Sequence, residues 1–313
     1  MLLHIVNIVL PVFLIAAVGY ALGWWNRRRQ LHEADSGDSA DQRQLLQQIA
    51  FNIAGPVLVF NAILESDVGL NTLGQTVLVA VVMYVTLAAL GWLIGTLLQW
   101  SDASRRAAVL SLAAKNCGNY GLPIMLFAFG DTGLAIGATF MIAHTLMHMT
   151  VGISVAAWKR SRSPLSNLAQ FFKTPYLYAI ALALVLRTAG IELPTSLGRA
   201  VELTGNLWIP LNLLVLGIEL AHVRRAGMLG ASAMLTAVKL IVPPVVAFGL
   251  TELLGIGGVW QAVLVLQSST PVAINGLLVA RQYNVRPDLV ATTLLLSTLG
   301  SVITVSVLLW LFG

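Results

Sequence analysis

The chain has 313 residues, of which 58% are hydrophobic and only 10% are charged, and its mean hydropathy is +0.84. A soluble domain carries roughly 25% charged residues, so this composition excludes a soluble enzyme and indicates an integral membrane protein. The formal net charge of +5 comes from residues between apolar segments, which argues against a nucleic-acid partner. The single cysteine, Cys117, excludes an internal disulfide and a metal site of the CxxC type.

Ten apolar segments follow one another along the chain, and about 20 apolar residues span a bilayer. The first lacks a preceding basic region, so it is interpreted as a membrane span and not as a cleaved signal. The polar stretch 26–44 is expected to be a mobile loop. The ten segments are 3–25, 43–64, 72–99, 107–129, 132–157, 174–190, 200–220, 229–254, 259–281 and 288–312.

Basic residues gather in alternate loops between these segments, and such loops face the cytoplasm. Fourteen of the 18 lysines and arginines lie in the alternate set that begins with the first loop. The other loops hold only Arg187 and Arg199 among several carboxylates, while Lys115 and Lys239 lie within spans. This alternation predicts a multi-pass protein of the cell (inner) membrane with both termini on the non-cytoplasmic side.

The two halves of the chain repeat each other at an offset of 154 residues. Asn52-x-x-x-Pro56 in the second segment matches Asn206-x-x-x-Pro210 in the seventh, and residues 108–112 of the fourth match 262–266 of the ninth. Each half holds five spans, and because five is odd the second half must enter the membrane from the opposite side. The pattern predicts an inverted-topology repeat, which is typical of secondary transporters.

Two segments carry polar interruptions that a helix in lipid should avoid. The fourth contains Lys115 and then the run 116–123, which holds two asparagines, two glycines and a proline, and the ninth contains the run 267–276. Non-helical backbone at membrane depth is tolerated only when it is buried in protein or lines a wet cavity. Two interrupted helices at corresponding positions point to the binding site of a transporter.

These breaks favour an anion, because half-helices that begin at Pro123 and Pro271 would direct free N–H groups and positive dipole ends toward the midplane. The opposite half-helix ends offer carbonyl groups that could hold a coupling proton or sodium ion. The predicted substrate-binding residues are Asn116, Lys115, Asn119, Ser269, Thr270 and Asn275.

Several of these residues have a second interpretation. The asparagines could simply satisfy broken backbone. Lys115 either neutralises a substrate carboxylate or pairs structurally with Glu219 or Glu65, and Lys239 requires an internal partner. The two glutamates are otherwise expected to be solvated or interfacial, with proton coupling as the alternative.

A histidine pair, His144 and His148, has the i, i+4 spacing that can chelate a metal. No third ligand is evident, so polar interhelical contact or proton handling is preferred, and neither a metal nor a cofactor is expected. Gly91 and Gly95 in the third segment are interpreted as packing contacts.

The same residues carry a resemblance to the auxin efflux carrier family. It rests on the run 280–289 (ARQYNVRPDL), on Asn116 placed seven residues before Pro123, and on Phe60-Asn61 at the end of the Pro56 segment. The resemblance implies an all-α fold of ten transmembrane helices in two inverted halves, similar to sodium/proton antiporters and bile-acid symporters. Helices four and nine would be broken and would cross.

The resemblance also implies two structural units with different roles. Residues 1–70 and 159–222 would form a dimerising scaffold, and residues 71–158 and 223–313 a transport unit that moves in the manner of an elevator. Asn116 would contact the substrate carboxylate. Gly118, Gly121, Pro123, Pro271 and Gly276 would shape the crossing, and Asn52, Pro56, Asn206 and Pro210 would lie on the scaffold side.

Plant members of that family export auxin, and bacterial members include malonate and malate carriers. This chain has Gly276 where plant members have a second proline, and Lys115 where they have no lysine. Lys115 would suit a dicarboxylate better than an auxin-like monocarboxylate. The resulting hypothesis is a secondary transporter of a small organic anion. The alternatives are a non-transporting anion sensor and a membrane metalloenzyme that uses His144 and His148.

Overall fold

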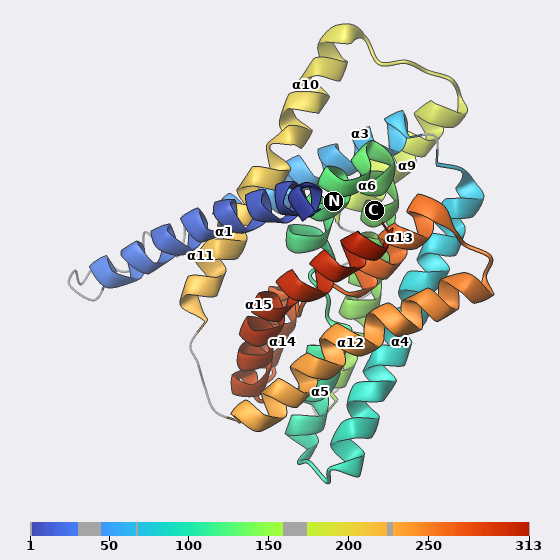
Figure 1. The fold of residues 1–313 in the computed structure, drawn as a ribbon. Coiled ribbons are helices and arrows are strands. Elements are labelled where there is room, and N and C mark those ends of the chain that lie inside the picture. Colours follow the sequence, from blue (N-terminus) through green and yellow to red (C-terminus); the bar gives the residue numbers. More distant parts are fainter. Residues whose placement is uncertain (1, 31–44, 67, 159–173, 224–227, 313) are drawn as a thin grey trace.

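The computed structural model describes residues 2–30, 45–66, 68–158, 174–223 and 228–312, and the regular elements within these ranges are all helical (Figure 1). The prediction of an all-helical membrane protein is therefore confirmed. Most of the expected loop 26–44 and all of 159–173 lie outside the described residues. The described part of the expected loop 26–44 is residues 26–30. These residues are helical, because the first helix continues to Gln30, so the loop was predicted to begin too early.

The first half of the chain contains long helices separated by short, wider π-helical turns. After residues 45–49, which are also helical, the elements through the middle of the chain follow in close succession. They are α1 (Leu2–Gln30), η1 (Ala50–Ala54), α3 (Gly55–Glu65), α4 (Leu70–Leu97), α5 (Asp102–Ala113), η2 (Cys117–Gly121), α6 (Leu122–Met147), η3 (His148–Gly152) and α7 (Ile153–Ala156).

The second half contains α9 (Pro175–Thr188), α10 (Thr195–Asn206), α11 (Trp208–His222), α12 (Leu229–Leu253), α13 (Gly258–Ser268), α14 (Ile274–Gln282) and α15 (Pro287–Phe312). Each of the ten apolar segments thus contains helix. By length and composition, seven helical stretches of the described chain are able to cross a membrane. The predicted number of ten is larger because α5, α9, α13 and α14 are short, and because one 40-residue stretch holds two segments.

That 40-residue stretch, Cys117–Ala156, is interrupted at Gly130. Gly130 has φ 61° and ψ −152°, a conformation that an L-residue rarely adopts, so the chain turns there between two helices. The interruption lies between the predicted segments 107–129 and 132–157, and it separates them as the sequence suggested.

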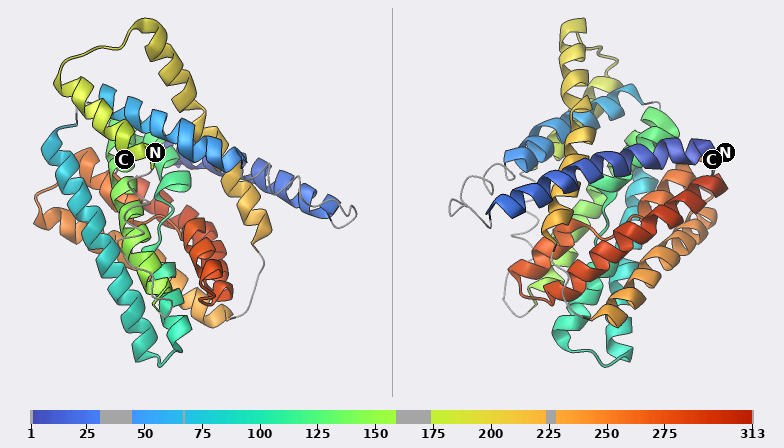
Figure 2. Two further views of the ribbon diagram at one scale, coloured as in Figure 1. Left: turned by 180° about the vertical axis from the view of Figure 1, so that it is seen from behind. Right: turned by 60° about the vertical axis from the view of Figure 1, so that its left-hand side comes forward.

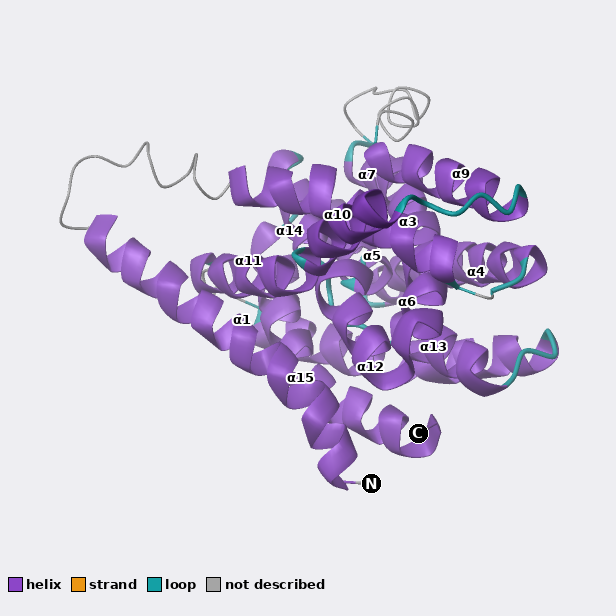
Figure 3. Ribbon diagram, turned by 90° about the horizontal axis from the view of Figure 1, so that it is seen from above, coloured by secondary structure: helices purple, strands orange, loops and turns teal. Residues whose placement is uncertain are grey.

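Helices approach one another closely where glycines face a neighbouring backbone. In α1 and α11, a Cβ atom at Gly19 or Gly217 would overlap the backbone of Leu214 or Ala16. Gly91 and Gly95 of α4 lie in the same way against Ala108 and Arg105 of α5, so the predicted packing role is confirmed. Figures 2 and 3 also show that the first turns of α1 and the last turns of α15 lie side by side at the chain ends.

We expect Gly217→Leu to destabilise the protein by at least 1–3 kcal/mol, the usual cost of overpacking, because the new side chain must separate α1 from α11. The measurement is thermal denaturation of the purified protein in detergent. Gly249→Leu in α12 is the matched control, since nothing lies within 4 Å of a Cβ there. Equal denaturation temperatures for the two variants would contradict the close approach.

Candidate functional site

The two predicted breaks meet and pair through their backbones. Asn116 N–H donates to the carbonyl of Pro271 at 2.9 Å, and Ala273 N–H donates to the carbonyl of Ala114 at 3.3 Å. Lys115 and Val272 thereby form an isolated antiparallel bridge. Residues 114–116 and 271–273, here called the crossing, satisfy each other's backbone groups in the interior. The prediction that both segments are broken is confirmed.

The prediction that a half-helix begins at each proline is confirmed for Pro123 and wrong for Pro271. α6 begins at Leu122 with Pro123 in its first turn, and the π-helical turn η2 precedes it from Cys117, whereas α14 begins at Ile274, three residues after Pro271. The helix-like turns of η2 are wide because Pro123 lacks an N–H and its ring would clash with the carbonyl of Asn119 in a regular α-helix. Pro271 lies in the extended crossing itself, where its carbonyl is an acceptor.

A buried lysine completes the crossing. Lys239 of α12 is fully buried, and its Nζ donates to the carbonyls of Leu112 at 2.7 Å and Ala114 at 3.1 Å. These carbonyls end α5, where a cation is favoured by the negative end of the helix dipole. The internal partner that the sequence required for Lys239 is therefore the backbone of the broken helix.

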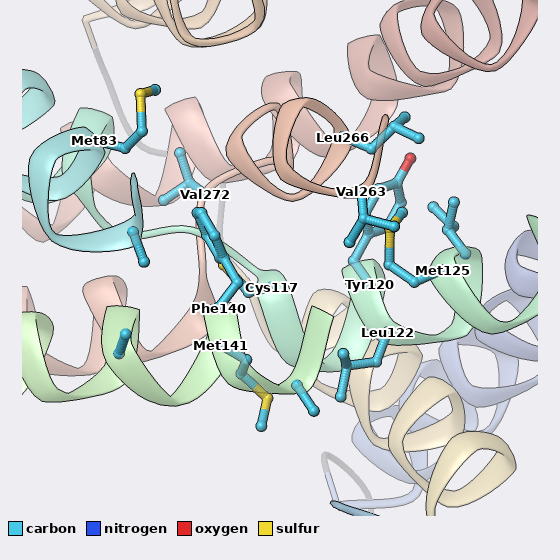
Figure 4. Packing of buried hydrophobic residues seen from close by; sticks show 14 of the residues in the cluster. Met83, Cys117, Tyr120, Leu122, Met125, Phe140, Met141, Val263, Leu266 and Val272 are labelled. Atoms are coloured by element: carbon cyan, nitrogen blue, oxygen red, sulfur yellow. The ribbon is translucent and has the colours of Figure 1, made fainter. Parts of the chain in front are cut away.

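Two adjoining cavities lie beside the crossing. The smaller, here called the polar cavity, has a volume of about 70 Å³ and the larger, the vestibule, about 330 Å³. They share the lining residues Phe51, Asn119, Met141, Thr145, Ile274 and Asn275. The polar cavity is also lined by Lys115, Asn116, Cys117, Gly118, His144, His148 and Ala273. Apolar packing closes the interior around it, with Cys117, Phe140, Met141 and Val272 close together (Figure 4).

Three nitrogen atoms at the polar cavity are buried without a hydrogen-bond partner among the described residues. They are Nζ of Lys115, Nδ2 of Asn116 and Nε2 of His148, on side chains that are 3%, 6% and 7% exposed. Burying such groups unpaired costs free energy. This arrangement is suited to a ligand that accepts hydrogen bonds and carries negative charge.

The proposed structural partners of Lys115 are engaged elsewhere or distant from the cavity. Glu219 lines the vestibule and accepts a hydrogen bond from Nε2 of Gln47 at 2.9 Å. Glu65 is exposed at the end of α3. The interpretation that Lys115 pairs with either glutamate is wrong, and its ammonium faces the polar cavity without a counter-charge from them.

The histidine pair makes contacts between helices. Nε2 of His144 lies 3.0 Å from the carbonyl of Ala113 and 3.2 Å from the backbone nitrogen of Lys115. Nδ1 of His148 lies 3.1 Å from the hydroxyl of Tyr84 in α4. The prediction of polar interhelical contact is confirmed for both. The part of the chain that the structure describes contains no group of three His, Cys, Asp or Glu side chains able to hold a metal.

The remaining predicted residues separate into two groups. Asn52 lines the vestibule, whereas Pro56, Asn206 and Pro210 line neither cavity. Ser269 and Thr270 also line neither cavity. Their hydroxyls donate to carbonyls at the end of their own helix, Ser269 to Val265 at 2.6 Å and Thr270 to Gln267 at 2.9 Å.

Two glycines of the predicted crossing allow close packing beside it. A Cβ at Gly121 would overlap the amide of Gln267, and one at Gly276 would lie 2.9 Å from Cβ of Ala114. A side chain larger than hydrogen at either position would therefore collide with a neighbouring residue.

The sequence-based prediction missed the π-helical turns, which are frequent at functional sites, and with them the lining residues Phe51 and Met149, although it had singled out Asn52, Asn119 and His148. All three such turns reach the cavities, η1 through Phe51 and Asn52, η2 through Asn119, and η3 through His148 and Met149. A signal was present for two of them. Asn119-x-x-x-Pro123 repeats the spacing of Asn52-x-x-x-Pro56, and in each case the π-helical turn ends two residues before the proline.

A family model described as "Membrane transport protein" matches residues 4–309. A protein of Methanothermobacter thermautotrophicus named "Uncharacterized transporter" is 26% identical over 275 residues, which are 85% of this chain and 87% of the relative. The "Uncharacterized transporter YfdV" of Escherichia coli is 24% identical over 100% of this chain and 98% of its own. A Rhizobium meliloti protein named "Putative malonate transporter" is 25% identical over 83% of each chain.

Cysteine substitution tests which residues line the cavities. In a Cys117→Ala background, we expect Asn119→Cys and Thr145→Cys to react with a small water-soluble thiol reagent at least about tenfold faster than Ser269→Cys. The first two positions line both cavities, whereas Ser269 is fully buried outside them. Labelling is followed by mass spectrometry of the intact protein. Similar rates at all three positions would show that the cavity boundary is misplaced.

Proposed function

The chain belongs to the membrane transport protein family, which is the auxin efflux carrier family that its sequence resembles, and on that premise we propose that it is a secondary transporter of a small organic anion. In this proposal the anion enters the vestibule and binds in the polar cavity at the crossing. The crossing then moves with the surrounding helices and exposes the anion on the other side.

The observation that carries the proposal is the set of three unpaired nitrogens at the polar cavity. Lys115 supplies a positive charge, Asn116 a neutral amide donor and His148 an imidazole nitrogen. A carboxylate is acceptor-only and has about four lone-pair sites, so one carboxylate could satisfy all three groups. The backbone N–H groups at the start of η2 add the positive end of a helix dipole beside them.

The charge distribution favours a dicarboxylate over a monocarboxylate. Lys115 lines the polar cavity, and Lys239 holds a second buried ammonium on the carbonyl of Ala114, the residue before it. Two positive charges in a region of low dielectric are best balanced by two negative ones. Glu219, at the vestibule, is separated from this positive region and disfavours anion binding there, which makes the polar cavity the better site.

The same proposal includes the finer architecture. Ten membrane crossings in two inverted halves are supported by the 154-residue repeat and by the antiparallel pairing of the two breaks. Elevator movement is supported by the position of the vestibule. It lies between residues of η1, α9 and α11, on the expected scaffold side, and residues of η2, α6, η3 and α14. Dimerisation through the scaffold helices rests on the family resemblance.

The vestibule is proposed to open to the cytoplasm. Gln47 and Thr174 line it, and they directly follow the basic stretches 26–44 and 159–173 in the chain. Such stretches face the cytoplasm. Both termini would then lie on the opposite side of the cell membrane, and the proximity of α1 and α15 at their ends agrees with this topology.

The Asn116 amide is the first test. We expect Asn116→Ala to reduce uptake of the correct carboxylate into proteoliposomes by about 10- to 100-fold, because a hydrogen bond to a charged group contributes about 1.5–3 kcal/mol. The matched control is Asn71→Ala at the exposed start of α4, outside both cavities. Unchanged transport by a folded Asn116→Ala protein would refute the assignment. Substrate binding without flux in the wild type would indicate a sensor instead.

Lys115 tests the substrate charge. Lys115→Gln keeps a hydrogen-bond donor in the polar cavity but removes the ammonium, so we expect it to weaken binding of malonate more than binding of a monocarboxylate of similar size. Thermal-shift titration of the purified variant against both ligands measures the difference. Equal losses for the two would mean that Lys115 does not distinguish substrates by charge.

A further inference from the structure

We propose that His148 takes up a proton when the anion binds, so that the protein carries the two together. The inference rests on the proposed function and names its coupling ion. It starts from the position of the imidazole, which is buried on η3. Nδ1 lies 3.1 Å from the Tyr84 hydroxyl, Nε2 has no hydrogen-bond partner of good geometry among the described residues, and the backbone of Asn275, which also lines the polar cavity, lies beside the ring.

The two ring nitrogens of His148 have different surroundings, so that the protonated ring can donate to Tyr84 and to a bound anion at the same time. In the imidazolium form both nitrogens are donors. Nδ1–H then donates to the Tyr84 hydroxyl oxygen, 3.1 Å away, and Nε2–H donates to a carboxylate oxygen in the cavity. A neutral imidazole either presents a lone pair at Nε2, which repels the carboxylate, or presents Nε2–H without a charge that attracts it. The proton comes from a hydronium ion or a buffer acid in the solvent that enters with the anion. Its bond to the donor breaks as the N–H bond of His148 forms, and water or the buffer base is released.

Other titratable groups near His148 are less suited to this role. Among the titratable side chains near the cavity, which also include Tyr84, Cys117, Lys115 and Lys239, an imidazole has the ordinary pKa closest to neutrality, at about 6.5. His144, one turn earlier, has its Nε2 occupied by the backbone of Ala113 and Lys115. The unpaired nitrogen of His148 is therefore the proton site that opens onto the cavity.

The charges around the cavity couple the proton to the anion. In the empty site, the ammonium group of Lys239 repels a positive charge on His148. A bound carboxylate or dicarboxylate reverses the local field, and an opposite charge at about 4–6 Å favours the charged form of a titratable group. By linkage, a protonated His148 then increases the affinity for the anion. That gain is present at low pH and is lost as the pH rises through the titration of His148.

The backbone at η3 is shaped around this pair. A Cβ at Gly152 would overlap the Tyr84 hydroxyl and lie 2.8 Å from Nδ1 of His148. The π-helical turn His148–Gly152 thus places a residue without a side chain over the hydrogen bond. An ordinary side chain at position 152 would separate the tyrosine from the histidine.

Isothermal titration of the full-length protein in detergent tests the proposal. The probe is the tightest binder among malonate, malate and indole-3-acetate, titrated at pH 7 in two buffers of different ionisation enthalpy. We expect the wild type to take up about 0.5–1 proton per anion, and its dissociation constant to decrease by up to about tenfold per unit fall in pH. His148→Gln should bind more weakly, with proton uptake near zero.

The control is His222→Gln, since His222 lies at the end of α11 and lines neither cavity; it should retain the wild-type proton uptake. If His148→Gln does not fold, Tyr84→Phe replaces it, because this variant keeps the imidazole but removes the partner of Nδ1, and its affinity should depend less on pH. Anion binding by the wild type without proton uptake would overturn the inference and leave the proposed function intact. Proton uptake that persists in His148→Gln would also overturn it. Failure of the wild type to bind any of the anions would refute the proposed function.

Discussion

The structure depends on how backbone groups are satisfied where two helices are broken in a low-dielectric interior. An unpaired backbone group at membrane depth costs several kcal/mol, and each break exposes several. The two breaks satisfy each other's backbone groups, because the N–H groups of Asn116 and Ala273 donate to carbonyls across the crossing. Lys239 then neutralises the carbonyl end of α5 through Leu112 and Ala114. Neither broken helix could be buried in this way without the other.

Because backbone and Lys239 satisfy the crossing, its side chains remain free for other contacts. Asparagines next to a break commonly hydrogen-bond the local backbone, which was the alternative interpretation of Asn116. Here the backbone N–H of Asn116 is paired and its amide nitrogen is unpaired at a cavity. Nζ of Lys115 and Nε2 of His148 are likewise unpaired at this cavity. A site with several unsatisfied donors is stabilised by any ligand that satisfies them, and this links the broken fold to the anion binding that we propose.

Much of this arrangement follows from the sequence, because Lys115, Asn116 and Pro123 cannot continue a lipid-exposed helix without a cost. These residues predicted the first break, and the 154-residue repeat with the polar run 267–276 predicted the second. The helical turn before Pro123 could not be predicted, since a wide π-helical turn allows a helix to begin at Cys117 and to accommodate Pro123 in its second turn. The hydroxyls of Ser269 and Thr270 were assigned to the ligand but bond their own helix end. Such local bonds compete with other partners, and sequence alone does not decide between them.

The ammonium groups of Lys115 and Lys239 also have an electrical consequence. Both are buried at the crossing and face no carboxylate among the described residues. Displacing one elementary charge across the full membrane potential involves about 2.3 kcal/mol per 100 mV. If the crossing moves through this field, the empty protein carries two positive charges with it, whereas a bound dianion cancels two charges and the accompanying proton on His148 adds one. The membrane voltage would then act more strongly on the empty carrier than on the loaded one, and transport would generate a measurable current.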